Sequence, residues 1–84
     1  MEATPGMIVR SRAGHDKGRF MVITAVEGYF AFAADGKERK LSKPKKKRLK
    51  HLSVTRTVIA LDDLTDKGLR SCLREFAEKG RQSH

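Results

Sequence analysis

A series of short apolar runs, each bounded by Gly, Pro or Asp, sets the strongest limit on the fold of this chain. Residues 7–11 alternate in polarity, residues 20–26 are rich in β-branched side chains and apolar on both faces, and residues 29–34 form a third run. Such runs favour strands, and the residues between them favour turns. With a short basic return at 39–42 and a further candidate at 57–61, the pattern predicts a small barrel of about five strands.

The apolar period changes after Asp63. Apolar residues then recur at the spacing of one helical stripe, at Leu69, Cys72, Leu73, Phe76 and Ala77. Thr65 or Asp63 can cap the start of a helix, and Gly80 suits its end. We therefore expect a mainly β protein with a C-terminal α-helix at 65–80 packed on a barrel at 5–62, all within a single domain spanning 1–84. We expect the helix to cover one open end of the barrel.

Positive charge is concentrated in one stretch of the chain. The formal net charge is +9, and residues 37–51 hold nine Lys and Arg against one acid, Glu38. We call residues 37–51 the basic segment. A clustered field of one sign points to a polyanionic partner. A solvated face usually mixes signs, a nuclear address is suggested by "PKKKR", and membrane attachment would need an amphipathic helix, which Pro44 interrupts. RNA is the partner that we favour.

Groups for catalysis or metal binding do not occur in a suitable pattern. His15, His51 and His84 have no Cys or carboxylate at a spacing that implies a site, and Cys72 lies on the apolar helix stripe. No CxxC or HxxxH spacing is present. We expect no enzyme activity, no metal and no cofactor. A single Cys, no long apolar run and no basic-then-apolar leader indicate a reduced cytoplasmic protein without membrane attachment.

The stretch "GHDKGR" at 14–19 places two glycines and two basic residues between predicted strands. It is either a plain hairpin loop or a turn where backbone approaches an RNA chain. Residues 5–26, "PGMIVRSRAGHDKGRFMVITAV", resemble a KOW motif, and residues 28–52 are similar to KOW-bearing large-subunit ribosomal proteins of the fourteen-e type, which have short bacterial homologues. The resemblance covers roughly residues 5–62. It implies an SH3-like barrel that binds structured RNA, most simply ribosomal RNA.

That resemblance and the charge pattern together give the expected contact residues. They are Arg10, Arg12, Lys17, Arg19, Arg39, Lys40, Lys43, Lys45, Lys46, Lys47, Arg48, Lys50 and His51. Lysine suits phosphate without reading base edges. Because the few aromatic residues sit in apolar runs, we expect them in the core and expect recognition by phosphate and shape, with little base stacking. The protein should be a ribosome-associated monomer when free, with ribosomal proteins as further partners. The alternative is a transcription-coupled or protein-docking module of the NusG type.

Overall fold

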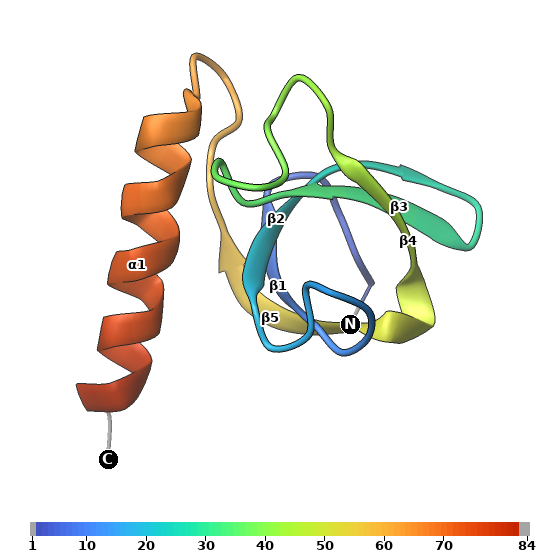
Figure 1. The fold of residues 1–84 in the computed structure, drawn as a ribbon, viewed down its shortest axis with the longest axis horizontal. Helices are drawn as coiled ribbons and strands as arrows, with labels where there is room; N and C mark the ends of the chain where they lie inside the picture. Colours follow the sequence, from blue (N-terminus) through green and yellow to red (C-terminus); the bar gives the residue numbers. More distant parts are fainter. Residues whose placement is uncertain (1, 83–84) are drawn as a thin grey trace.

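The computed structural model describes residues 2–82, with side chains for residues 2–80. Within this range one antiparallel sheet holds five strands, β1 (Met7–Ser11), β2 (Phe20–Glu27), β3 (Phe30–Ala34), β4 (Lys45–Arg48) and β5 (Leu52–Val58). A 3-10 turn, η1 (Leu49–His51), joins β4 to β5, and a helix, α1 (Asp66–Gln82), follows. The strand order is β4-β3-β2-β1-β5, and the sheet curls into a small barrel (Figure 1). The expected fold class is confirmed.

The apolar alternation builds two clusters on opposite faces of the curled sheet. The cluster inside the barrel consists of Met7, Val9, Met21, Ile23, Ala31, Ala33 and Leu52, with Ala3 and Leu49 against it. The cluster outside the barrel consists of Ile8, Val22, Ala34, Leu69 and Leu73, with Phe20, Leu41, Ile59, Leu61, Leu64 and Phe76 against it. Strand β2 contributes to both clusters because it is apolar on both faces.

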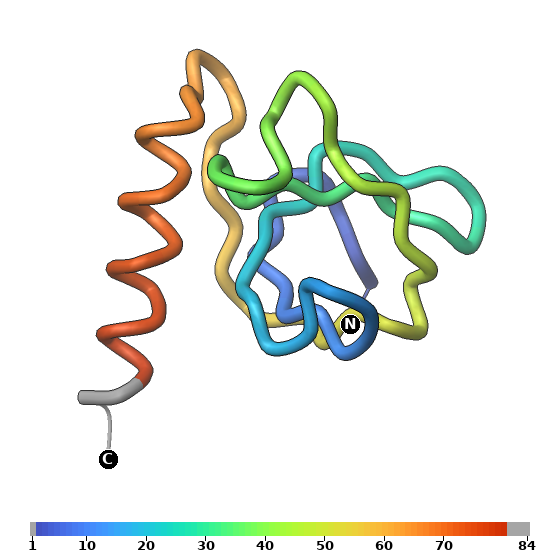
Figure 2. Tube along the Cα trace, in the orientation of Figure 1, coloured from blue at the N-terminus to red at the C-terminus, as the bar shows by residue number. Residues whose placement is uncertain are grey.

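Helix α1 packs against the outer wall of the barrel, not over an open end as the sequence had suggested. Figures 1 and 2 show it standing beside the ring of strands. Its Leu69 is fully buried in the outer cluster, and Phe76 meets Phe20 of β2 edge to face with ring centroids 5.2 Å apart. The physical reason lies in β1 and β2, whose outward Ile8 and Val22 would otherwise expose apolar surface to water.

The ends of α1 agree only in part with expectation. Thr65 caps the start, because its hydroxyl oxygen accepts the backbone N–H of Gly68 at 3.0 Å. Gly80 does not end the helix, which continues to Gln82. A glycine lowers helix stability but does not by itself terminate a helix.

Two predicted strands lie elsewhere. The basic return is β4 at 45–48, not 39–42, and the last strand is β5 at 52–58, not 57–61. The Asp35 carboxylate accepts the backbone N–H groups of Lys37 and Arg39 at 2.9 and 2.8 Å, which folds this stretch into a compact loop. Ladder pairing starts directly after Pro44, which has no N–H to donate.

Candidate nucleic-acid interface

The loop between β1 and β2, residues 12–19, packs against the basic segment. We call it the glycine loop, because Gly14 and Gly18 adopt φ of +78° and +88°, a backbone conformation that residues other than glycine rarely adopt. The backbone N–H of Arg12 donates to the His51 carbonyl at 2.8 Å. Two regions that are distant in sequence, both predicted to contact RNA, therefore lie side by side.

Asp16 is the centre of this junction. It is 2% exposed, and its Oδ2 lies 3.4 Å from Lys47 Nζ and 3.6 Å from Arg39 Nε. Lys47 Nζ also donates to the Ala13 carbonyl at 3.3 Å. A buried carboxylate needs such partners, because an unpaired charge away from water is costly.

Lys47 consequently differs from the solvent-facing lysine that the charge pattern suggested. Its side chain is 8% exposed, and its ammonium is held inside the protein. In the ladder Lys47 lies opposite Ala31, which faces the barrel interior, whereas Lys46 lies opposite Phe32. The alternation of a strand thus places Lys45 and Lys47, opposite Ala33 and Ala31, on the inner side, and Lys46 and Arg48 on the outer side. Of the two inner lysines, Lys45 is exposed and only Lys47 is enclosed.

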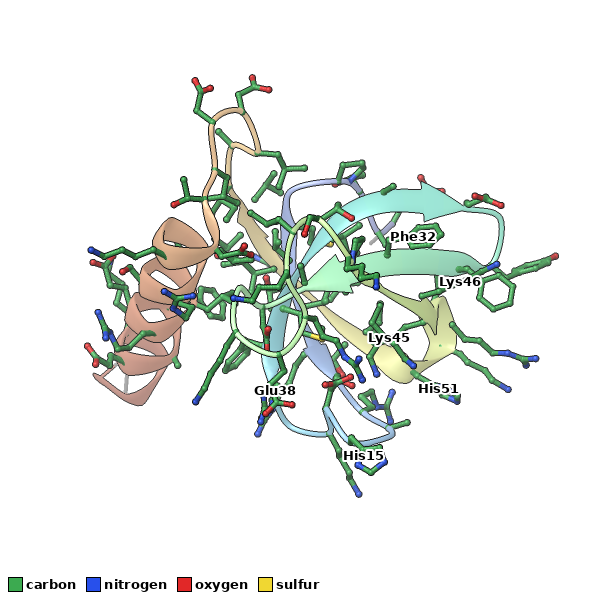
Figure 3. All side chains as sticks on the ribbon, turned by 45° about the horizontal axis from the view of Figure 1, so that its top comes forward. His15, Phe32, Glu38, Lys45, Lys46 and His51 are labelled. Carbon is green, nitrogen blue, oxygen red and sulfur yellow. The ribbon has the colours of Figure 1, made fainter. Side chains whose placement is uncertain are left out.

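The other cations of the basic segment remain accessible. The exposed ones are Lys37, Lys40, Lys43, Lys45, Lys46, Arg48 and Lys50, while Arg39 and His51 are half-buried. Arg12 and Lys17 of the glycine loop are exposed as well. In Figure 3, Lys46 and Phe32 lie on the β3–β4 side of the barrel, and His15 lies in the glycine loop. Most of the predicted contact residues are therefore available to a ligand.

A second cationic surface lies between α1 and the barrel. A groove of about 960 Å³ there is lined by the cations Arg10, Arg19, Lys37, Arg70 and Arg74, with the acid Asp35 and the apolar Phe20, Leu73, Phe76 and Ala77. We call this the basic groove. Five cations from the first strand, the glycine loop, the β3–β4 connection and the helix converge on it.

Internal bonds orient several guanidinium groups of the basic groove. Arg10 Nε donates to the Gly18 carbonyl at 3.1 Å, and its guanidinium lies 5.5 Å from the centre of the Phe20 ring. Arg70 Nη1 donates to the Gly36 carbonyl at 2.5 Å. Because a guanidinium has five N–H donors, one such bond positions the group and leaves other donors for an anion.

Arg19 is more heavily engaged, since it pairs with Asp35 at 3.3 Å and with Glu38 at 3.4 Å. The hydrogen bond with Asp35 and the charge of Glu38 raise the pKa of Arg19. Burial alone would raise the pKa of Asp35, but the backbone N–H groups of Arg39 and Lys37, with Arg19, outweigh burial and lower it. In this corner of the groove the charge of Arg19 is therefore already paired with carboxylates of the protein itself.

Arg70, Arg74 and Lys37 were missed as contact residues from the sequence. Arg70 and Arg74 are four residues apart, so they lie on one side of a helix, next to the apolar stripe that begins at Leu69. This spacing was a usable signal. What the sequence did not reveal was that α1 lies along the outer wall, where that side of the helix faces Arg10 and Arg19 of the barrel.

The histidines and the cysteine, which we expect to have no catalytic function, lie in different parts of the structure. Among residues 2–80, no three His, Cys, Asp or Glu side chains gather as a metal site requires. His15 is exposed, His51 and Cys72 are half-buried, and His84 lies outside the described residues. No helix in the described part of the chain is both long and apolar enough to cross a membrane.

Comparison with protein-family models and with curated proteins gives no relative from which to transfer a function. No protein-family model matches the chain, and no curated protein matches it significantly. The class of protein is therefore defined by the fold alone, as a small antiparallel β-barrel with a helix on its outer wall and clustered surface cations.

Proposed function

We propose that this protein binds structured RNA, mainly through phosphate contacts, and that the RNA is ribosomal. The observation that carries the proposal is the junction of the glycine loop with the basic segment, which gathers cations from two separate stretches. Between residues 39 and 51 no acid interrupts the charge. Lysines in such a cluster repel one another, and a polyanion relieves that repulsion.

The basic groove supports the same function from the helix side. Arginine guanidinium groups offer paired donors that suit phosphate oxygens, and a concave wall brings several to one backbone segment. The groove gives α1 a role in binding in addition to its packing role. We propose that RNA phosphates contact Arg70 and Arg74 together with the basic segment.

The assignment to the ribosome rests on the KOW resemblance of residues 5–62, and a cytoplasmic location belongs to the same proposal. Cosedimentation with large ribosomal subunits from a cell lysate tests it. We expect the protein in the large-subunit peak at low salt. Its absence from that peak, with RNA binding intact, would assign it to another RNA.

Salt dependence tests RNA binding itself. If about five phosphates are contacted, the logarithm of affinity should fall with the logarithm of salt concentration with a slope of about −3 to −5. Lys46→Glu should weaken binding strongly, and Lys67→Glu, the same reversal at an exposed lysine at the start of α1, should not. Binding that is indifferent to salt and to Lys46→Glu would contradict the proposal and favour the alternative, in which this protein is a transcription-coupled or protein-docking module of the NusG type.

A further inference from the structure

Three aromatic residues lie outside both apolar clusters. The sequence had placed them in the core, at the start and middle of the third strand. Tyr29 instead lies in the turn between β2 and β3 and is 86% exposed, while Phe30 and Phe32 of β3 are half-buried. Their neighbours Ala31 and Ala33 are fully buried inside the barrel, so strand alternation turns both phenylalanines outward. We call Tyr29, Phe30 and Phe32 the aromatic face.

Cations border the aromatic face along β4. In the β3–β4 ladder Phe30 lies opposite Arg48, and Phe32 lies opposite Lys46. Lys46 Nζ is 4.5 Å from the centre of the Phe30 ring, and the Arg48 guanidinium is 5.9 Å from it. Both cations sit within the distance at which a charge is attracted to a ring face. Figure 3 shows Phe32 and Lys46 on this side of the molecule.

A pocket extends this surface to the turn. It has a volume of about 330 Å³ and is lined by Tyr29, Phe30, Arg48, Leu49 and Lys50. On the opposite border of β3, the exposed Glu27 pairs in register with Phe30. Positive charge therefore follows β4, and the acid lies on the β2 side. Of the two borders of the aromatic face, only the one along β4 attracts a phosphate chain.

Packing does not explain this arrangement. Single exposed apolar side chains are common, but three aromatic residues together on one small face indicate a contact surface. Tyr29 supports no core, and a turn residue with a small polar side chain would connect β2 to β3 equally well. Aromatic rings beside Lys and Arg are the arrangement by which proteins stack unpaired bases while holding their phosphates.

We propose that the aromatic face stacks unpaired bases of RNA, with Lys46, Arg48 and Lys50 holding the adjoining phosphates. This inference rests on the proposed RNA binding and makes it specific, because the target then contains a single-stranded loop, bulge or end. Shape and phosphate contacts alone would favour a duplex. About two or three nucleotides fit such a three-ring surface.

The composition of the chain permits a direct test. Tyr29 is the one tyrosine and there is no tryptophan, so Tyr29→Trp introduces a single indole at the aromatic face. This variant is titrated with oligouridylate, with a fully paired RNA duplex and with linear polyphosphate of matched charge. We expect oligouridylate to quench the indole strongly, and polyphosphate to bind with little quenching. Equal quenching by polyphosphate, or none by oligouridylate that binds, would overturn the stacking proposal.

Truncation variants measure the contribution of each ring. Tyr29→Ala and Phe32→Ala should each weaken oligouridylate binding by about fivefold to about 150-fold, as loss of one base–aromatic stack does. Duplex binding should change little. Val58→Ala is the matched control, because Val58 is 56% exposed on β5. Because Tyr29 is exposed and packs in no core, misfolding would not explain a loss of oligouridylate affinity in Tyr29→Ala.

The outcomes separate this inference from the function on which it rests. If neither oligouridylate nor duplex binds, RNA binding itself is wrong. If RNA binds in a salt-dependent way but Tyr29→Ala and Phe32→Ala bind oligouridylate like the unaltered protein, only the stacking proposal is wrong. Loss of ribosome cosedimentation in these variants, with oligouridylate affinity unchanged, would instead mark the aromatic face as a protein contact.

Discussion

The ammonium of Lys47 lies 3.4 Å from the carboxylate of Asp16, and both side chains are buried. The pair joins the glycine loop to β4. It fixes the position of the loop that carries Arg12, Lys17 and Arg19 relative to the exposed lysines of the basic segment. One residue of the basic run is thus used to build the interface and not to present charge.

Removal of Asp16 should destabilise the fold. Asp16→Ala leaves Lys47 buried without its carboxylate and takes the charge partner from Arg39, so we expect the free energy of unfolding to fall by about 3 kcal/mol. Urea denaturation measures it. Adding Lys47→Met to Asp16→Ala should recover part of the loss, because an apolar side chain of similar length needs no partner. An Asp16→Ala variant as stable as the original would show that the pair contributes little.

Two neighbouring lysines allow a matched comparison of binding. Lys46→Met should weaken RNA binding and reduce the steepness of its salt dependence by about 1, the effect of losing one phosphate contact. Lys47→Met should leave that slope unchanged, because the Lys47 ammonium is occupied by Asp16 and the Ala13 carbonyl. Fluorescence anisotropy of labelled RNA over a salt series measures both. If Lys47→Met remains folded but loses more RNA affinity than Lys46→Met, the assignment of Lys46 to phosphate contact and of Lys47 to internal pairing would be contradicted.

Much of the barrel could be predicted because its signals are local. The alternation at Met7–Ser11 and the two-sided apolar run at 20–26 identify strands, whereas the cover that α1 gives to the outer face was expected at an open end of the barrel. Strand β4 could not be placed because "KKKR" has no apolar alternation. In the structure it pairs with β3, where Lys47 lies opposite Ala31, and the Lys47 side chain is only 8% exposed beside Asp16.

The sequence predicted which segment of the candidate site is rich in charge, but it did not predict how the charged side chains are arranged in space. Counting charges located the basic segment, and most of its lysines are exposed. The buried lysine is the one whose ammonium meets Asp16 of the glycine loop, a residue distant from Lys47 in sequence. The basic groove likewise depends on where α1 docks. Tyr29 is exposed because the third strand starts at Phe30, one residue later than the expected run at 29–34. Such contacts join residues that are far apart in the sequence, so no local sequence pattern predicts them.

The basic groove can be tested from the helix. Arg74 is exposed and lines the groove, whereas Arg56 is exposed on β5 and does not line it. Arg74→Glu should therefore weaken RNA binding and reduce the salt slope by about 1 or more, since it removes an attractive charge and adds a repulsive one. Arg56→Glu changes net charge equally and should have a smaller effect. Equal effects of the two reversals would indicate a general charge effect and exclude the groove as a contact.

Asp35 should make the stability of the protein sensitive to acid. The folded protein lowers the pKa of Asp35 despite burial, through the backbone N–H groups of Arg39 and Lys37 and the Arg19 guanidinium. A lowered folded-state pKa means that the ionised carboxylate stabilises the fold. This contribution is complete above the unfolded-state pKa of about 3.9, and it is lost as pH falls through the lower folded-state value.

Comparison with Asp35→Asn isolates that contribution. The amide can still accept backbone bonds but has no charge for Arg19, so the variant should be less stable than the original protein at about pH 7. The gap in unfolding free energy should narrow as pH falls below about 4, because the carboxyl of the original protein becomes neutral too. Glu38→Gln, which removes the other partner of Arg19, should retain the acid-dependent loss. Urea denaturation at a series of pH values measures the gap, and a gap that stays constant down to about pH 2 would contradict this role for Asp35.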